Sequence, residues 1–250
     1  MNTPDTLSRA RILLGEASMN KLRDARVIVF GVGGVGSWCV ESLVRSGLCH
    51  ITIVDDDRVC ASNVNRQLMA TTETLGRVKV EAMRDHLVTI NPCVDVIARH
   101  ERFTAETADA FDLDSYDYVV DAIDSVPDKM LLIERATRSR AKLFSSMGAA
   151  RKLDPGRIKV AEFFKVAGCP LARALRQRFK KTGTHPARKF KCVYSDELVP
   201  NLGENDAAER ANGSLMHITA IFGLTLAGLI IADITTKDKQ DARPAAQSQV

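Results

Sequence analysis

The sequence contains few cysteines, and none of them has the spacing that a metal-binding pair requires. Its 250 residues include six cysteines, and no two of these form a C-x-x-C pair. We therefore expect neither a disulfide scaffold nor a zinc knuckle, and a reducing, cytoplasmic setting. Residues 1–15 also lack the uninterrupted apolar run and small-residue cleavage site of a secretory signal, so we expect no export.

The chain also has no internal repeat and no biased composition. Because 45% of the residues are hydrophobic and 26% are charged, disordered, collagen-like and fibrous classes are excluded. The net charge of +4 is unevenly distributed, since residues 151–200 hold 13 Lys or Arg against 4 Asp or Glu. This asymmetry indicates that one region meets a polyanionic partner.

Strand-like and helical patterns alternate through the first 150 residues. Strands are expected over 25–30, 50–54, 94–98, 116–120 and 142–146, with helices over 37–46, 77–90, 105–111 and 129–140. This alternation predicts an α/β fold with a doubly wound, mostly parallel, Rossmann-like sheet.

The second half is expected to form a C-terminal extension packed on that sheet. It contains a strand-like run over 157–164, a helix over 170–181, a polar loop over 200–212 and a long apolar helix over 214–233. That helix reaches the length of a membrane span, but His217, two glycines and the lack of flanking aromatic anchors favour a core helix and no membrane association. We expect one domain over 1–236, with a nucleotide-binding half at about 20–150, a basic substrate-facing half at about 151–236, and a flexible tail over 237–250.

A glycine motif follows the first expected strand and opens a helix. Gly31, Gly33 and Gly36 satisfy G-x-G-x-x-G, and Asp55 follows at the end of the next strand. Glycines at these positions allow a tight turn and bring backbone N–H groups close to a phosphate, while the carboxylate suits ribose hydroxyls. A nucleotide site is therefore predicted. The motif alone fits both a dinucleotide redox enzyme and an enzyme that uses ATP.

Charged residues further along the chain separate these two hypotheses. Adenylyl transfer needs fixed cations near the phosphates, and Arg66 and Lys79 lie where both can face them. Asp124 follows another strand, where a carboxylate can hold Mg²⁺. In the alternative interpretation, the two cations are solvated surface charges and Asp124 caps the helix that begins near Pro127.

Several of these motifs together resemble the ubiquitin-activating-enzyme-like adenylyltransferases (ThiF, MoeB and HesA). They are the glycine run, the aspartates after the second strand, and the segments at 65–67, 76–79, 90–92 and 121–124. The resemblance implies activation of a carboxylate by ATP with Mg²⁺, and a homodimer. It assigns nucleotide binding to Gly31, Gly33, Gly34, Gly36, Asp55, Asp57, Asn63 and Gln67, and catalysis to Arg66, Lys79, Asp124 (which would hold Mg²⁺) and Arg9.

Arg9 is the least specific of these assignments. It resembles an N-terminal arginine that reaches the triphosphate of the neighbouring subunit in the family's dimers. Arg11 lies two residues away, and either arginine is equally consistent with a solvated surface charge.

The second half points to the carboxylate that is activated. Sulfur-carrier activators usually bind zinc through two C-x-x-C pairs, which this chain lacks. Segments 145–149, 152–155, 169–172 and 193–195 instead resemble the tRNA threonylcarbamoyladenosine dehydratases. The pair Ala150-Arg151 departs from that pattern, which has a smaller or amide pair there.

A basic segment supports tRNA as the partner without reference to any family. Eight cations and no acidic residue lie between positions 173 and 191: Arg173, Arg176, Arg178, Lys180, Lys181, Arg188, Lys189 and Lys191. The first two and Lys180 share one helical face, a cationic stripe suited to a phosphate backbone. A solvated basic helix is the alternative. Cys169 and Cys192 are either inert buried residues or the site of a covalent thioester.

These observations lead to one principal hypothesis and three alternatives. The principal one is ATP-dependent dehydration (cyclisation) of N6-threonylcarbamoyladenosine in tRNA through an acyl-adenylate, with ATP and Mg²⁺ and without zinc. The second is activation of the C-terminal glycine of a ubiquitin-like sulfur-carrier protein, with a carrier or sulfur-transfer protein as partner. An NAD-dependent oxidoreductase and a nucleotide-sensing scaffold are opposed by Arg66, Lys79 and Asp124.

Overall fold

One seven-stranded sheet organises the part of the chain that the structure describes. This structure, a computed structural model, describes residues 6–203 and 212–241, with side chains up to 235 in the second range. The strand order is β3-β2-β1-β4-β5-β7-β6, and only β6 runs antiparallel to its neighbour. The strands are β1 (Arg26–Phe30), β2 (His50–Val54), β3 (Asp95–Arg99), β4 (Tyr118–Asp121), β5 (Lys142–Ser146), β6 (Ile158–Glu162) and β7 (Lys191–Ser195). The predicted doubly wound, mostly parallel α/β sheet is confirmed.

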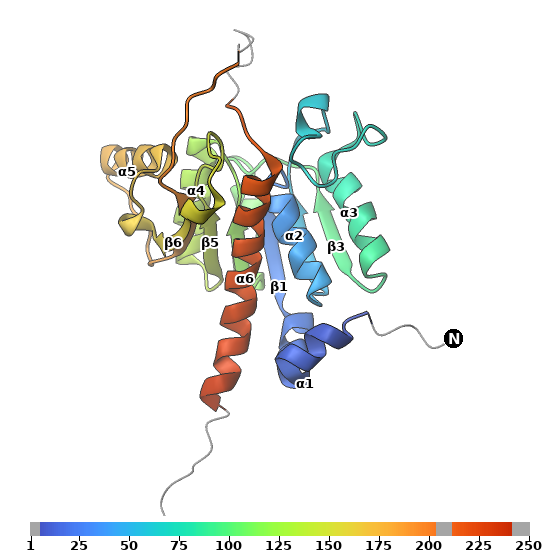
Figure 1. The fold of residues 1–250 in the computed structure, drawn as a ribbon. Coiled ribbons are helices and arrows are strands. Elements are labelled where there is room, and N and C mark those ends of the chain that lie inside the picture. The colour runs from blue at the N-terminus through green and yellow to red at the C-terminus, as the bar shows by residue number, and fades with distance from the viewer. Residues whose placement is uncertain (1–5, 204–211, 242–250) are drawn as a thin grey trace, which may run out of the picture.

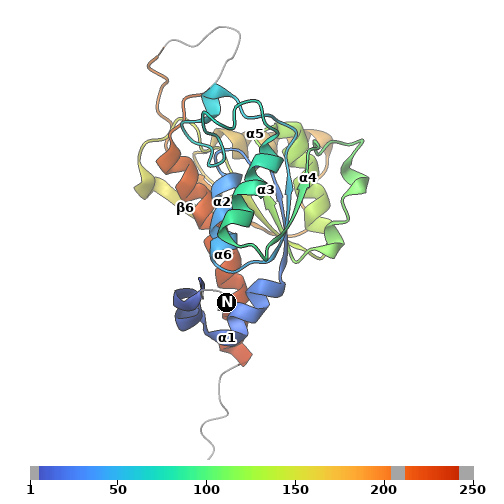
Figure 2. The same ribbon diagram turned by 90° about the vertical axis from the view of Figure 1, so that its right-hand side faces the viewer.

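Helices cover both faces of the sheet. They are α1 (Ser8–Asp24), α2 (Gly36–Arg45), α3 (Lys79–Ile90), α4 (Val126–Arg138), α5 (Pro170–Thr182) and α6 (Met216–Asp241). Figure 1 shows α2 and α6 side by side in front of the sheet, and Figure 2 shows α4 on the opposite face. Four of the five residues in each of β1, β2 and β5 are buried, as expected for strands that are covered on both faces.

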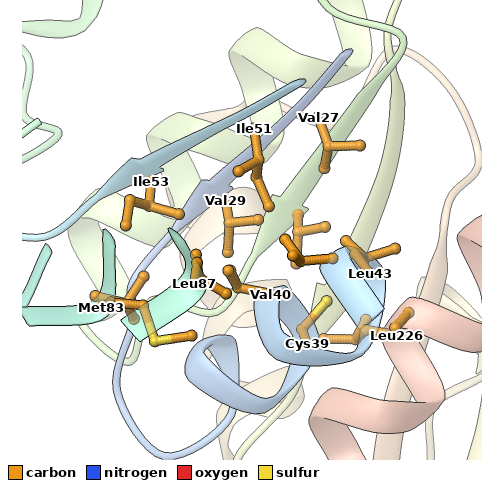
Figure 3. Packing of buried hydrophobic residues seen from close by; sticks show 14 of the residues in the cluster. Val27, Val29, Cys39, Val40, Leu43, Ile51, Ile53, Met83, Leu87 and Leu226 are labelled. Atoms are coloured by element: carbon orange, nitrogen blue, oxygen red, sulfur yellow. The ribbon is translucent and has the colours of Figure 1, made fainter. Parts of the chain in front are cut away.

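Two apolar clusters fill the space between the sheet and its helices. Because side chains alternate along a strand, Val27 and Val29 of β1 enter one cluster, and Ile28 and Phe30 enter the other. Figure 3 shows the first cluster, in which β1 and β2 residues meet Val40 of α2 and neighbouring side chains of α3 and α6. The second cluster joins the sheet to α4 and α5.

The long apolar helix predicted near the C-terminus is α6, and it packs on the body of the protein. Its residues 216–235 are long and apolar enough to cross a membrane, yet half of that stretch is buried inside the protein. The buried positions recur every fourth residue: Ile218, Phe222, Leu226, Ile230 and Ile234. This spacing places one apolar stripe against α2 and the sheet, as expected for a core helix.

Three segments differ from the sequence-based expectation, and one of them is β7, a strand that was not predicted. The helix predicted over 105–111 is a series of turns that contains only the short 3₁₀ helix η2 (Ala108–Ala110). Thr107 causes the difference, because its hydroxyl donates to the carbonyl of Arg102 and accepts from the backbone N–H of Thr104. Such local bonds compete with a regular helix. The kinked helix α1 was not predicted, since it buries few residues and Gly15 interrupts it with a φ of 75°.

Near the C-terminus, α6 continues through the first residues of the predicted tail and ends at Asp241. The rest of that tail, 242–250, lies outside the described residues, as do positions 204–211 of the predicted polar loop.

Two glycines of α6 offer a matched test of this packing. A Cβ at Gly223 would lie 2.3 Å from the carbonyl oxygen of Val35 and 2.8 Å from the backbone nitrogen of Cys39, whereas a Cβ at Gly228 meets nothing within 4 Å. We predict that Gly223→Ala lowers stability by about 1–3 kcal/mol through overpacking. Gly228→Ala should raise it by up to about 1 kcal/mol through helix propensity. Thermal unfolding of both variants measures this, and shifts of the same sign would contradict the α2–α6 contact.

Candidate functional site

A cavity of about 770 Å³ opens at the carboxyl ends of the parallel strands. Gly31 follows β1, Asp55 follows β2, Ala122 follows β4 and Met147 follows β5, and all four line it. The strand order reverses between β1 and β4, so the cavity lies at the switch point where doubly wound sheets bind ligands.

Most of the residues predicted to bind the nucleotide or to act in catalysis meet in this cavity. Ten of the twelve line it: Gly31, Gly33, Gly34, Asp55, Asp57, Asn63, Arg66, Gln67, Lys79 and Asp124. The structure therefore brings together residues that are up to 93 positions apart in the sequence. The two that do not line it are Gly36 and Arg9.

Close backbone packing explains the glycines of the motif. Gly31 has a φ of 86°, and a Cβ there would lie 2.8 Å from the carbonyl oxygen of Ala122. A Cβ at Gly36 would lie 1.8 Å from the carbonyl oxygen of Gly31. Gly36 therefore allows the loop to fold back on itself and does not face the cavity. The result is a tight loop that leads directly into α2.

A buried lysine and two aspartates form the charged centre of the cavity. Lys79 Nζ lies 2.6 Å from Asp57 Oδ2 and 3.9 Å from Asp55 Oδ1, and its side chain is 6% exposed. Asp55 also accepts hydrogen bonds from the backbone N–H groups of Val32 and Asp57. Burial raises the pKa of Asp55, although Lys79 and these N–H groups oppose the rise. The ionised carboxylate is thus held at a cost that a ligand donor would offset.

The segment that carries Arg66 and Gln67 is anchored to α2. Trp38 Nε1 donates to the carbonyl oxygen of Arg66 at 3.0 Å, and the backbone N–H of Leu68 donates to Ser37 Oγ at 3.2 Å. Arg66 Nη1 donates to the carbonyl oxygen of Ser62 at 2.6 Å. Gln67 is buried, and its Oε1 accepts no hydrogen bond from the described residues. This orphaned acceptor lies on a side chain of the cavity wall, where a ligand can satisfy it.

An ion pair beneath the cavity fixes the segment that follows β4. Lys129 Nζ lies 2.8 Å from Asp121 Oδ2, with both side chains fully buried, and it also donates to the carbonyl oxygen of Ile123. Ser145 Oγ donates to the same carboxylate. Asp124 is the next residue on this fixed segment. It is exposed, lines the cavity and has no side-chain partner among the described residues. The helix cap considered for it is not formed, because Ser125 is the N-cap residue of α4 and no side chain caps that helix.

Arg9 is remote from the cavity of its own chain. It lies on α1, beyond the amino ends of the strands, whereas the cavity is at their carboxyl ends (Figure 1). Arg9 therefore cannot reach the cavity of its own chain, and its predicted role across a dimer stays a prediction.

The sequence model of the ThiF family matches residues 7–247. The chain belongs to the ThiF family. It is similar to the tRNA threonylcarbamoyladenosine dehydratase of Bacillus subtilis, with 34% identity covering 91% of this chain and 93% of that one. The crystal structure of the E. coli enzyme TcdA with AMP superposes with a TM-score of 0.86 and 32% identity, covering 94% and 96% of the two chains. The predicted resemblance is confirmed.

A weaker similarity relates the chain to the adenylyltransferase and sulfurtransferase MOCS3 of Culex quinquefasciatus. The identity is 36%, but the match covers 58% of this chain and 33% of that protein. The B. subtilis dehydratase and E. coli TcdA are thus matched over nearly their whole length, and MOCS3 over a part of its length. The E. coli TcdA has also been solved in complex with ATP, and that structure superposes with a TM-score of 0.85.

The second half of this ThiF-family chain contributes a part of the cavity wall that sequence reasoning missed. Ser146 ends β5 and residues 147–152 follow it, Pro170 and Leu171 begin α5, and Leu198, Ser214 and Thr219 come from the C-terminal segments. Thr219 lies 3.3 Å from the position of a Cβ on Gly34, so α6 touches the glycine loop. Segments 145–149, 152–155 and 169–172 carry the resemblance to the dehydratases, but that resemblance did not place them at the cavity. Leu198, Ser214 and Thr219 lie in no motif, and tertiary packing alone brings them there.

The predicted tRNA-binding cations divide into two groups in the folded ThiF-family protein. Six are exposed and have no side-chain hydrogen bond or ion pair with the described residues: Arg173, Arg178, Lys180, Lys181, Lys189 and Lys191. Arg176 instead donates to the carbonyl oxygens of Phe163 and Val166, and Arg188 donates to carbonyl oxygens at the end of α4, including that of Thr137 at 2.9 Å. These two arginines stabilise the fold, so the predicted cationic stripe keeps Arg173 and Lys180 and loses Arg176.

The two cysteines considered for a thioester are both buried in the ThiF-family fold. Cys169 is 1% exposed and Cys192 is fully buried. Burial raises the pKa of the Cys192 thiol. A reactive thiol needs access and a stabilised thiolate, so the structure favours the inert alternative.

The raised pKa of Asp55 generates a prediction about stability and pH. Because the folded protein binds this proton more tightly than the unfolded chain does, the contribution of Asp55 to stability falls as pH rises through its folded pKa, above 3.8. The difference in melting temperature, Asp55→Asn minus wild type, should therefore increase as pH rises. A tenfold difference in proton affinity is about 1.4 kcal/mol, a few degrees in a protein of this size.

Asp85 provides a control of opposite sign. The hydrogen bond that Arg77 donates to Asp85 lowers the pKa of Asp85 below its ordinary value of 3.8. The contribution of Asp85 to stability is therefore fully present above pH 3.8 and is lost as pH falls through the folded pKa. Asp85→Asn should lose melting temperature relative to the wild type as pH rises. Thermal unfolding from pH 2 to 8 compares the two, and a difference for Asp55→Asn that does not change with pH would show that Asp55 titrates normally.

Proposed function

We propose that this protein uses ATP to activate the carboxylate of N6-threonylcarbamoyladenosine in tRNA, and that it then closes the activated side chain into a ring with net loss of water. One observation carries the proposal. A cavity with the nucleotide and phosphate residues of an adenylyltransferase continues into residues of the second half, beside an exposed basic segment. The similarity to the B. subtilis and E. coli tRNA threonylcarbamoyladenosine dehydratases extends over nearly the whole length of each chain, and it supports the same substrate.

The residues of the cavity fit a nucleoside triphosphate. The loop from Gly31 to Gly34 leaves space for phosphates beside the amino end of α2, where backbone N–H groups favour anions. The Asp55 carboxylate suits two ribose hydroxyls, and the orphaned Oε1 of Gln67 is an acceptor for a ligand donor. The relative from E. coli has been solved with ATP and with AMP.

The cations of the cavity suit transfer of the adenylyl group. A carboxylate oxygen of the substrate forms a bond to the α-phosphorus, while the bond from that phosphorus to pyrophosphate breaks and its electron pair leaves with the pyrophosphate. Negative charge grows on the phosphoryl oxygens and on the leaving group. Arg66 and Lys79, fixed by Trp38 and by Asp57, stabilise that charge without rearranging.

Mg²⁺ is the metal that suits the remaining carboxylate. Asp124 has no partner among the described side chains, and its oxygens are the hard donors that Mg²⁺ prefers. The carboxylates of Asp55, Asp56 and Asp57, which also line the cavity, lie within 4.8 Å of one another. Mg²⁺ held by Asp124 would neutralise part of the negative charge of the triphosphate. We infer no zinc requirement.

The second chemical step needs little further machinery. The activated carbonyl carbon is attacked from within the same side chain, the ring bond forms, and the bond to AMP breaks. Because both groups belong to one molecule, their effective concentration is high. The protein's part is to hold the nucleoside in the cavity. We further propose a cytoplasmic homodimer in which the partner's Arg9 reaches the phosphates.

Pyrophosphate exchange tests this function directly. The wild type should exchange pyrophosphate into ATP only with tRNA that carries threonylcarbamoyladenosine, and the tRNA should lose the mass of one water. Lys79→Met should lower the exchange by about 10²- to 10³-fold, because a fixed cation at the developing charge is lost. Arg77→Met removes an exposed cation two residues away that pairs with Asp85, and it should leave the exchange unchanged.

A different pattern of pyrophosphate exchange would favour sulfur-carrier activation. Exchange that fails with modified tRNA and occurs with a small protein ending in Gly-Gly would overturn the proposal in favour of the MOCS3-like activity. Exchange with neither substrate would show that the cavity does not adenylate a carboxylate.

Salt dependence tests the basic segment as the tRNA-binding surface. Lys180 and Lys181 are exposed at the end of α5, and replacing both with Gln should weaken tRNA binding and reduce the slope of log Kd against log salt by about 2 if each contacts a phosphate. The double variant Arg45→Gln and Arg84→Gln removes the same charge from exposed positions on α2 and α3. Equal loss of slope in both would mean that overall charge, and not this surface, binds tRNA.

A further inference from the structure

Arg151 is the one residue other than glycine in the described part of the chain that has a positive φ. Its φ is 61°, a left-handed conformation that is unfavourable for a residue with a long side chain. Two backbone hydrogen bonds hold it there: its N–H donates to the carbonyl oxygen of Gly213 at 2.9 Å, and its own carbonyl oxygen accepts from the N–H of Val199 at 3.0 Å. Strain of this kind, when it is held in place beside a cavity, is a sign of function.

The side chain of Arg151 has spare donors at the cavity. Nε donates to the carbonyl oxygen of Val199 at 2.8 Å, which fixes the guanidinium plane. The two terminal nitrogens have no partner among the described residues, and Arg151 lines the cavity. The neighbouring cation, Lys152, is different, because its Nζ is buried and donates to the carbonyl oxygens of Ser195 and Glu197. Arg151 is therefore the cation of this wall that remains available to a ligand.

The location of Arg151 points to the second substrate and not to ATP. The residues that fit ribose and phosphates come from the segments that follow β1, β2 and β4. Arg151 comes from the loop after β5, where a Cβ on Gly148 would lie 3.7 Å from Leu171. The Nε of Arg151 contacts Val199, the neighbour of the cavity residue Leu198. Leu171 belongs to α5, which carries exposed basic residues from Arg173 onward. A tRNA bound along α5 thus presents its modified nucleoside to the part of the cavity where Arg151 lies.

We propose that Arg151 binds the carboxylate of the substrate and positions it for attack on the α-phosphorus of ATP. The inference rests on the proposed function. Two anions must meet in this reaction, and their repulsion is a barrier that a fixed cation lowers. The planar guanidinium, anchored through Nε, offers its terminal N–H groups to both carboxylate oxygens, a geometry that lysine does not reproduce.

Replacement by glycine separates this role from a structural one. Glycine adopts a φ near 61° without strain, so Arg151→Gly should fold and should keep or raise the melting temperature. In pyrophosphate exchange, its KM for modified tRNA should rise by about 10- to 100-fold, as expected for the loss of charge-assisted hydrogen bonds. The Kd for ATP should stay unchanged. Asparagine tolerates the same backbone conformation and carries no charge, so Arg151→Asn should show the same rise in KM. Arg151→Lys keeps the charge and should show a smaller rise.

Unmodified tRNA separates the carboxylate from backbone phosphates. If Arg151 binds the carboxylate, Arg151→Gly weakens binding of tRNA with threonylcarbamoyladenosine and leaves the Kd for unmodified tRNA at its wild-type value. An equal loss for both tRNAs, or an unchanged KM for modified tRNA, would overturn the inference while wild-type exchange still supports the function. A wild type without any tRNA-dependent exchange would instead refute the proposed function itself.

Discussion

The buried ion pair between Asp121 and Lys129 is the interaction on which the site depends. It fixes the backbone from the end of β4 to Ile123, because Lys129 also holds the carbonyl oxygen of that residue and Ser145 holds the carboxylate. Ala122 on this segment forms the surface on which the loop at Gly31 packs. The loss of either charged partner would leave an unpaired charge in the core, at a cost of about 3–5 kcal/mol. One interaction thus places both the glycine loop and Asp124.

The sequence predicted well which residues meet around the glycine loop, because these residues lie in short motifs next to strand ends. The glycines, Asp55 and Lys79 belong to short motifs whose spacing reflects the strand and helix that they connect. The sequence did not reveal the contribution of the second half, since residues such as Leu198 and Thr219 carry no motif and reach the cavity through packing alone. The same limit explains the wrong helix at 105–111, where a single threonine hydroxyl redirects the backbone.

In the basic segment, the number of charges did not show which side chains are available to a ligand. The excess of cations between positions 173 and 191 was evident from the sequence, but the partners of each side chain were not. In the fold, Arg176 and Arg188 satisfy carbonyl oxygens at the ends of other elements, and the remaining six cations stay exposed. Carbonyl oxygens at a helix end have no partner within the helix, and long cationic side chains can donate to them. A basic cluster in a sequence therefore gives an upper limit to the charge that is available for nucleic acid.

The division of the cavity between two halves of the chain bears on how one family activates different carboxylates. The wall for the nucleotide is built from contiguous motifs and must satisfy the same triphosphate in each case. The other wall is assembled from separate segments, so its residues can change without disturbing the phosphates. Arg151 illustrates this freedom, because its strained backbone is held by Gly213 and Val199 and not by any nucleotide-binding residue. Recognition of the carboxylate is thus physically separate from the chemistry that activates it.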